Sequence, residues 1–301
     1  MNSVLTLSLL QATLQASAPL ILAAMGGVIS HQAGIFNFSL EGLMLFGAFF
    51  AVYGVILTNN PFLGVVLGAI AAAVVSLIYG LAVVGLRADA IIAAFGINLL
   101  AAGATGFLLR ALLGEVGGVF APEGLGSATP AFIAQLPVIG PILAGQSALV
   151  YLAILSGPLV ALFIYRTVLG LRIRAVGEAP DAAEAAGIHP SRVQYVALAL
   201  TGVLCGLAGA QLSLGFLSQF TENVTAGRGI IAFAAVIVGL NRPIPVYLSA
   251  LFFGFATALT DRLQGLGFPQ ELIVLAPYVI TIIALAIGSG RSRSVRLQTA
   301  S

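Results

Sequence analysis

Long apolar stretches recur along the whole chain, and they limit its fold more than any other feature. Each is about 20 residues long, the length that a helix needs to cross a hydrocarbon core of roughly 30 Å. A backbone inside lipid must satisfy its own hydrogen bonds, so an uninterrupted apolar run of this length forms a helix rather than a barrel strand of about 10 alternating residues. We therefore expect an all-α, polytopic integral membrane protein.

The stretches predict about nine transmembrane helices, within a range of eight to ten, in a single membrane domain that covers residues 1–301. The seventh stretch is the weakest, because its apolar part is short and follows Gly227, Arg228 and Gly229. A broken or re-entrant helix is the alternative there. The first stretch lacks a basic leader region, so we interpret it as a retained helix. The predicted spans are 5–29, 38–57, 62–86, 90–113, 147–165, 193–217, 225–240, 244–260 and 272–287.

Composition excludes several functions for this chain. Of its 301 residues, 60% are hydrophobic and 7% are charged, against roughly 25% charged in a soluble domain. The net charge of +2 and the scattered basic residues do not indicate a nucleic-acid partner. The sequence contains no lysine, which a phosphate-binding loop of the Walker type requires, so any ATP must bind to another chain. Cys205 is the single cysteine, and we expect a packed side chain rather than a redox centre.

Arginine positions predict the orientation of the spans, because arginine is retained on the cytoplasmic side of short loops. The segment 166–192 carries four arginines, and Arg291, Arg293 and Arg296 follow the last span. Both regions then face the cytoplasm, together with Arg87, and the N-terminus lies outside. The same count places these residues at or near the outer face: Arg110, Glu115, Glu123, Glu222, Asp261, Arg262 and Glu271.

Small residues at four-residue spacing indicate close contacts between helices. Packing within the chain is favoured over a dimer contact. The two sets are Gly64, Gly68 and Ala72, and Gly202, Gly206 and Ala210. Asn59, Asn60 and Pro61 in turn predict a tight turn that makes the second and third spans an antiparallel hairpin.

The inner loop, 166–194, is the most informative part of the sequence. Within it, GEAPDAAEAAGI predicts a short alanine-rich helix that ends at Gly187 and Pro190. Such a helix cannot bury itself, and its acidic residues flank an alanine face. It suits docking into a groove on a cytoplasmic partner, and a solvated connector is the equally weighted alternative.

The same loop resembles the cytoplasmic coupling helix of ABC importer permeases, whose pattern is E-A-A-x-x-x-G. Asp181, Ala182, Ala183 and Gly187 match that spacing, with Asp in place of Glu and without the family's ILP-like ending. AGIFNFSLEGLMLFGAF and TAGRGIIAFAAVIVG, followed by Arg242 and Pro243, are similar to two further segments of the permeases that import nucleosides and simple sugars. The resemblance to this family, which includes ribose-type and branched-chain amino acid-like permeases, covers residues from about 24 to 243.

The resemblance implies a transport subunit of a bacterial inner membrane and not an enzyme, with no cofactor of its own. ATP hydrolysis is expected on a cytoplasmic ATP-binding subunit, and an extracytoplasmic binding protein or lipoprotein is expected to deliver the solute. A second, different permease is expected to complete a heterodimer that works by alternating access. The residues expected to couple the chain to the ATPase are Glu178, Asp181, Ala182, Ala183, Glu184 and Gly187.

Polar residues within spans are candidates for the substrate pathway, because a charge at the bilayer centre costs about 2.5 to 3.5 kcal/mol. Glu41 stands four residues beyond Asn37, which puts both on one face of a predicted helix; a structural carboxylate at a helix bend is the favoured alternative to a role in the pathway. Asn98 and Gln211 suit ribose hydroxyls or a base edge, and bonds between helices are equally weighted. Phe36, Phe38 and Phe95 could stack on a base, although packed or lipid-facing rings are favoured.

Two other functions remain open from the residues alone. A proton-coupled secondary transporter would use Glu41 and Asp89, but the chain lacks a visible inverted repeat. A scaffold without transport is the third reading. His31 and His189 are too far apart in sequence to suggest a metal site. The residues do not decide which nucleoside or sugar would be carried.

Overall fold

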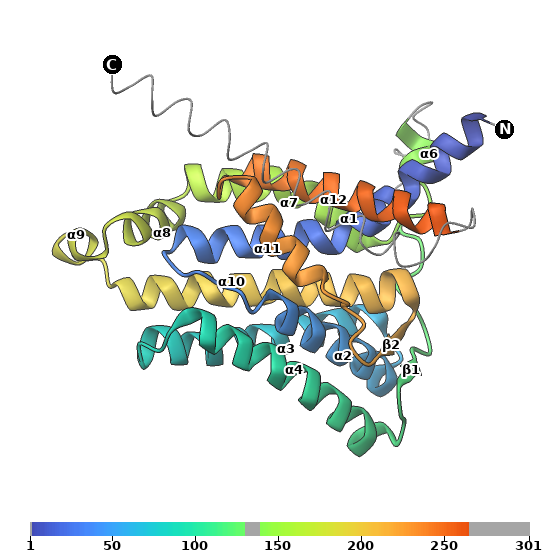
Figure 1. Ribbon diagram of the computed structural model, residues 1–301, viewed down its shortest axis with the longest axis horizontal. Helices are drawn as coiled ribbons and strands as arrows, with labels where there is room; N and C mark the ends of the chain where they lie inside the picture. The colour runs from blue at the N-terminus through green and yellow to red at the C-terminus, as the bar shows by residue number, and fades with distance from the viewer. Residues whose placement is uncertain (1, 130–138, 265–301) are drawn as a thin grey trace.

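The computed structural model describes residues 2–129 and 139–264 as a bundle of helices that run side by side (Figure 1). Two of the helices, α3 and α10, continue as π-helical segments, Leu81–Gly85 and Gln211–Leu217. The helices are α1 (Asn2–Gln32), α2 (Leu40–Thr58), α3 (Pro61–Gly80), α4 (Ala90–Leu113), α6 (Ile139–Leu143), α7 (Ala148–Arg166), α8 (Val168–Glu178), α9 (Pro180–Ala185), α10 (Pro190–Ala210), α11 (Arg228–Val238) and α12 (Pro243–Gln264).

Seven helical segments in the described part of the chain are long and apolar enough to cross a membrane. They correspond to the first six predicted spans and the eighth, which confirms a polytopic helical membrane protein. The ninth predicted span, 272–287, lies outside the described residues. The seven segments are Leu7–Gln32, Leu40–Thr58, Pro61–Gly85, Ala90–Leu113, Ala148–Arg166, Pro190–Leu217 and Pro243–Arg262.

The second span begins later than predicted, because residues 35–38 are not helical. Gly34 has a φ of 81°, which ends the turn after α1, and the chain then runs extended to α2. The Asn37 side-chain oxygen accepts bonds from the Ser39 N–H at 3.0 Å and the Ser39 hydroxyl at 2.6 Å, and this local turn competes with a helix. The prediction that Asn37 and Glu41 share one helical face is therefore wrong.

The seventh predicted span is a short helix, which matches the alternative of a broken or re-entrant helix rather than a full span. Its 11 residues, α11, would cover only about half of a hydrocarbon core. Ala226 and Gly227 have φ values of 45° and 81°, so the chain becomes helical only at Arg228. Both α2 and α11 therefore begin after non-helical segments.

A two-stranded antiparallel ribbon joins the segment after α4 to the segment after α10, a feature that the all-α prediction did not contain. Strand β1 (Gly118–Phe120) pairs with β2 (Gln219–Thr221), with Val119 opposite Phe220. Arg110 and Glu222, which the orientation argument places on the same side, form an ion pair of 3.3 Å beside the ribbon. The ribbon is too short to show in the sequence pattern, since each strand has three residues.

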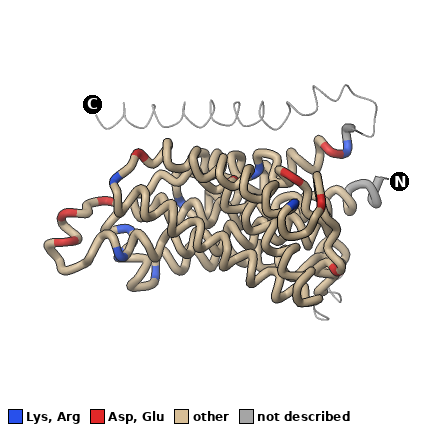
Figure 2. Tube along the Cα trace, turned by 90° about the horizontal axis from the view of Figure 1, so that it is seen from below, with Lys and Arg blue, Asp and Glu red and all other residues tan. Residues whose placement is uncertain are grey.

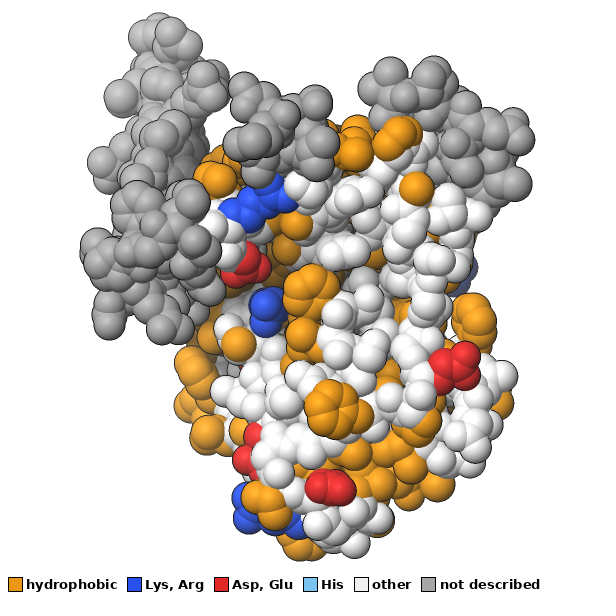
Figure 3. All heavy atoms as spheres, turned by 90° about the vertical axis from the view of Figure 1, so that its right-hand side faces the viewer, with side chains coloured by type: hydrophobic (Ala, Val, Ile, Leu, Met, Phe, Trp, Pro, Cys, Tyr) orange, Lys and Arg blue, Asp and Glu red, His pale blue; other side chains and the backbone are white. Residues whose placement is uncertain are grey.

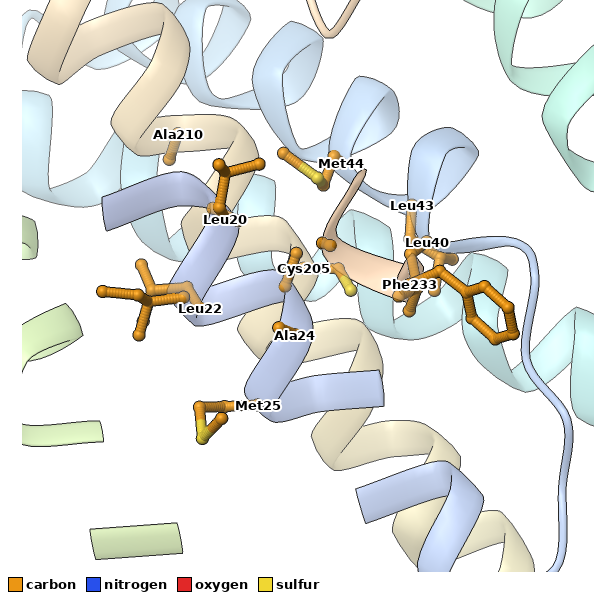
Figure 4. Packing of buried hydrophobic residues seen from close by; sticks show 14 of the residues in the cluster. Leu20, Leu22, Ala24, Met25, Leu40, Leu43, Met44, Cys205, Ala210 and Phe233 are labelled. Atoms are coloured by element: carbon orange, nitrogen blue, oxygen red, sulfur yellow. The ribbon is translucent and has the colours of Figure 1, made fainter. Parts of the chain in front are cut away.

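The core lies where α1, α2, α3 and α10 pack together. Figure 4 shows buried side chains of α1, α2, α10 and α11 there, and Cys205 is fully buried. An added Cβ on Gly68 would lie 2.5 Å from the Gly47 carbonyl oxygen, and one on Gly206 would lie 2.6 Å from the Ala69 Cα. The small residues thus serve packing within the chain, as the sequence favoured.

Most charged positions of the described residues lie at the two ends of the bundle (Figure 2). Helices α8 and α9 form one end, and β1 and β2 lie at the other (Figure 1). At the ribbon end, a few charged side chains are scattered among hydrophobic ones outside the grey region (Figure 3). This distribution fits a slab of lipid around the middle of the bundle.

Candidate functional site

The beginnings of α2 and α11 meet inside the bundle, and Glu41 joins them. One Glu41 carboxylate oxygen accepts bonds from the Thr225 hydroxyl at 2.5 Å and the Gly227 N–H at 2.8 Å. The other oxygen accepts a bond from the Gly229 N–H at 2.6 Å. The carboxylate of α2 therefore caps the first turn of α11, where N–H groups have no partner within their own helix.

These bonds explain how a carboxylate is tolerated inside a mostly apolar bundle. A hydrogen bond to a charged group contributes about 1.5 to 3 kcal/mol, and the positive end of a helix dipole adds to it. Three such donors offset the cost of about 2.5 to 3.5 kcal/mol for a charge in a membrane. The geometry supports the structural alternative for Glu41 without testing a role in the pathway.

Asn98 and Asn37 lie around the same helix beginning. From α4, the Asn98 side-chain oxygen accepts a bond from the Gly42 N–H at 2.9 Å, and its NH₂ group donates to the Phe38 carbonyl at 3.1 Å. Asn37 is buried, and its NH₂ group has no hydrogen-bond partner among the described residues. The structure thus brings together three of the four predicted pathway residues.

Gln211 belongs to a different part of the bundle. It is buried at the first position of the π-helical segment after α10, where its side-chain oxygen accepts a bond from the Ser147 hydroxyl at 2.6 Å. Its NH₂ group has no partner among the described residues. The contact with Ser147 matches the sequence alternative of hydrogen bonding between helices.

Four aromatic rings line one side of the α2 beginning. Phe233 of α11 contacts Phe36 and Phe38, with ring centroids 4.8 and 4.7 Å apart. Phe38 in turn lies 5.6 Å from Phe95 of α4. Phe36 and Phe95 keep 38% and 53% of their surface exposed, so the aromatic row, Phe36, Phe233, Phe38 and Phe95, opens to the outside of this chain.

The predicted alanine-rich helix is two helices rather than one. Pro180 lacks an N–H group and pushes Ala179 to an extended conformation with a φ of −151°, so α8 ends at Glu178 and α9 begins at Pro180. The end of α9 is as predicted, because Gly187 follows it with a φ of 79°.

The coupling residues lie at the end of the bundle, away from the ribbon. Asp181, Ala182, Glu184 and Gly187 are exposed, whereas Ala183 is buried against the rest of the chain. Glu178 is exposed as well, but it belongs to α8 rather than α9. An exposed α9 with one buried alanine is compatible with both sequence alternatives, a docking helix and a connector.

Gly177 and Gly34 connect this end to the segment that leads into α2. A Cβ on Gly177 would collide with the Gln32 carbonyl oxygen, and one on Gly34 would lie 3.2 Å from the Gly177 Cα. The two backbones therefore touch directly. A displacement of α8 must move the segment between α1 and α2, because interiors packed this closely transmit strain.

Asp89, which a proton-coupled transporter would use, lies at the beginning of α4. It caps α4, and one carboxylate oxygen accepts bonds from the Ile91 and Ile92 N–H groups, both at 2.9 Å. The residue is exposed at the end of a helix, not inside the bundle. Among the described residues, no group of three His, Cys, Asp or Glu side chains could hold a metal ion.

Sequence reasoning missed the partners that complete these contacts. Thr225 supplies a hydroxyl to Glu41, and Phe233 joins the aromatic row from a distant helix. The run TAGRG does indicate a break in the helix, since two glycines beside a threonine and an arginine interrupt an apolar span. No pattern in the sequence pairs that run with Glu41, because 184 positions separate Thr225 from it.

Comparisons with known proteins agree in pointing to transport permeases. A family model described as branched-chain amino acid transport system, permease component, matches residues 9–285. The nucleoside ABC transporter permease protein of Lactococcus lactis subsp. cremoris is 36% identical over 97% of this chain and 96% of its own length. The guanosine ABC transporter permease protein of Bacillus subtilis is 36% identical, over 93% and 92%. A putative glucose ABC transporter permease protein of Haloferax volcanii is 32% identical, over 96% and 94%. No solved structure matches the chain.

Proposed function

Because this chain belongs to the branched-chain amino acid transport family of permease components, we propose that it is the membrane-spanning subunit of an ATP-driven importer for nucleosides. Family membership makes it a multi-pass protein of the cytoplasmic membrane and a transport subunit rather than an enzyme. The observation that carries the proposal is the identity of 36% with two permeases named for nucleosides, over nearly the full length of each chain.

Three kinds of partner follow from this proposal. A cytoplasmic ATP-binding subunit supplies the energy, and an extracytoplasmic binding protein delivers the solute. A second permease subunit completes the pathway. In this proposal the second permease covers the aromatic row, where Phe36 and Phe95 are exposed in this chain, and so closes the wall of the solute channel.

Force from the ATPase enters through the inner loop in this proposal. Exposed residues of α9 dock into the motor subunit, while the buried Ala183 fixes the helix to the permease. Displacement of α8 then moves the segment after α1 through the contact of Gly177 with Gly34. The proposed coupling set is Glu178, Asp181, Ala182, Ala183, Glu184 and Gly187.

The solute pathway passes the beginning of α2. Non-helical backbone at membrane depth is tolerated where it lines a cavity or is buried in protein, and broken helices are a recurrent way to build solute sites near the midplane. Asn37, Glu41 and Asn98 surround this point, and the aromatic row offers faces on which a base can stack. Gln211 is a further pathway residue in this proposal, and it lies in a different part of the bundle, beside Ser147.

Uptake by the complete system tests the proposal. Membrane vesicles or cells carrying this chain with its partners should accumulate labelled guanosine when ATP is maintained and the proton gradient is abolished. Cells that lack only this chain provide the control. Loss of uptake on removal of the proton gradient alone, or ATP-independent uptake by the purified single chain, contradicts an ATP-driven importer. Uptake of glucose or ribose without guanosine contradicts the solute class.

A further inference from the structure

A polar cavity of about 360 Å³ lies at the end of the bundle that carries α8 and α9. The end of α1 and the segment after it contribute His31, Gln32 and Phe36. Glu178 comes from the end of α8, and Asn241 from the turn between α11 and α12. Its volume falls within the range of about 300 to 1,000 Å³ that is common for small-molecule sites.

The walls of this cavity are held in place by bonds between distant segments. The Gln32 NH₂ group donates to the Asn241 carbonyl at 2.7 Å. The Asn241 NH₂ group lies 2.6 Å from the His31 Nδ1. The backbones of Gly34 and Gly177 meet on another side. The side chains of His31, Gln32 and Asn241 are therefore preorganised by these bonds.

Two polar groups of the cavity have hydrogen-bond acceptors without a partner among the described residues. The side-chain oxygen of Asn241 is buried and has no hydrogen-bond partner among the described residues. The Glu178 carboxylate is exposed and takes part in no ion pair or hydrogen bond within the same residues. Both groups accept hydrogen bonds, so they fit a ligand with hydroxyl or amino donors.

An aromatic ring completes the lining. Phe36 exposes 38% of its surface and stands 4.8 Å from Phe233, the next ring of the aromatic row. Phe36 thus lies between the cavity and the next ring of the aromatic row. Base-to-aromatic stacking contributes a favourable term for any nucleobase, because every base has a π face. A neutral ligand is favoured over a phosphorylated one, because the Glu178 carboxylate repels a phosphate.

We propose that this cavity is a nucleoside-binding position on the cytoplasmic side, where the base stacks on Phe36 and the ribose hydroxyls donate to Glu178 and Asn241. The solute occupies it on leaving the pathway, after passing the α2 beginning. The inference rests on the proposed function and adds a second binding position to it.

Photolabelling of the assembled transporter tests this position. The complex is illuminated with 8-azidoguanosine in the absence of ATP, and labelled peptides are located by mass spectrometry. We expect label within residues 31–36, 177–178 or 241, and we expect excess guanosine to remove it while guanosine monophosphate does not. Label confined to other segments, or unaffected by guanosine, overturns the proposal.

Two variants separate binding from folding. Phe36→Leu should lower labelling of the cavity by at least about fivefold at a subsaturating concentration of 8-azidoguanosine. This factor corresponds to the lower end of the range for the loss of one stacking contact. Glu178→Gln should allow guanosine monophosphate to compete. Glu115→Gln is the control, because Glu115 is an exposed carboxylate that neither lines the cavity nor belongs to the proposed coupling set. Equal behaviour of Glu178→Gln and Glu115→Gln contradicts the role of Glu178.

The same preparation distinguishes a failure of this binding position from a failure of the proposed function. A complex that takes up guanosine but carries no label in the cavity refutes this binding position alone. A complex that takes up neither guanosine nor any other nucleoside while ATP is maintained refutes the proposed function as well.

Discussion

The polar contacts of Glu41 join two helices of the bundle. Its carboxylate serves three donors at the start of α11, although it belongs to the first turn of α2. The Glu41 carboxylate therefore links the beginnings of α2 and α11. If either helix moves during transport, these bonds must move with it or break, which makes the junction a sensitive point for both stability and uptake.

Replacing this carboxylate by an amide should weaken the junction. Glu41→Gln retains one accepting oxygen, so at least one N–H donor of the α11 beginning loses its partner. We expect a loss of about 1.5 to 3 kcal/mol, seen as a lower Tm of the purified complex, and slower guanosine uptake. Glu222→Gln is the control, since an exposed ion pair such as Arg110 with Glu222 contributes about 0 to 1 kcal/mol. Similar shifts for the two variants would show that the Glu41 bonds are not special.

Gly177 offers a second test at the scale of one residue. A methyl group there collides with the Gln32 carbonyl, so α8 must move away from the segment after α1. Gly177→Ala should lower the free energy of unfolding by about 1 to 3 kcal/mol and reduce uptake at least about tenfold. Gly103→Ala, in α4 with open space around it, should be neutral or slightly stabilising. Unchanged uptake in Gly177→Ala would argue against coupling through this contact.

The two ends of helix α9 determine which surface the inner loop offers to a motor subunit. The proline break at Ala179 separates α9 from α8, so α9 can take its own direction at the end of the bundle. Its C-terminal cap depends on a left-handed residue, Gly187. A side chain at that position strains the cap and redirects the chain into α10, which alters the surface offered to a motor subunit.

A pair of matched glycines tests the importance of this cap. Gly187 and Gly114 both follow a helix with positive φ, at 79° and 69°, and an added Cβ meets nothing within 4 Å at either one. A bulky residue costs about 1 to 2 kcal/mol at each. Gly187→Val should abolish uptake and ATPase coupling while membrane insertion is retained, whereas Gly114→Val should leave uptake nearly unchanged. Comparable uptake in both variants would contradict docking through α9.

At the scale of the whole molecule, the bundle has two chemically different ends. One end carries α8, α9 and the polar cavity, and the other carries the β1 and β2 ribbon with the ion pair of Arg110 and Glu222 (Figures 1 and 2). An importer needs this polarity, because its motor and its binding protein contact opposite faces. The arginine pattern predicts that the α8 and α9 end faces the cytoplasm.

Cysteine labelling checks that orientation in a favourable background, since Cys205 is fully buried. Val116→Cys, at a position 74% exposed near β1, should react with an impermeant thiol reagent on intact spheroplasts. Ala88→Cys and Glu184→Cys, exposed at the other end, should react only after permeabilisation. The opposite pattern would reverse the topology and place the proposed coupling residues on the wrong side.

Sequence alone determined the parts of this protein that depend on local composition. Apolar length identified six spans and the eighth, and Ala90 and Leu113 bound both the predicted fourth span and α4. Turn residues located the hairpin at Asn59 and Asn60 and the end of α9 at Gly187. Each of these features is set by residues close together in the chain, because a helix in lipid satisfies its own backbone.

The tertiary structure decided everything that joins distant segments. Asn37 and Glu41 looked like neighbours on a helix, but a local turn with Ser39 and a cap on α11 place them in different structures. The β1 and β2 pair, the aromatic row and the polar cavity likewise combine residues that are far apart in the sequence. Their partners are selected by packing in three dimensions, where an unpaired buried polar group must find a donor or acceptor wherever the fold provides one.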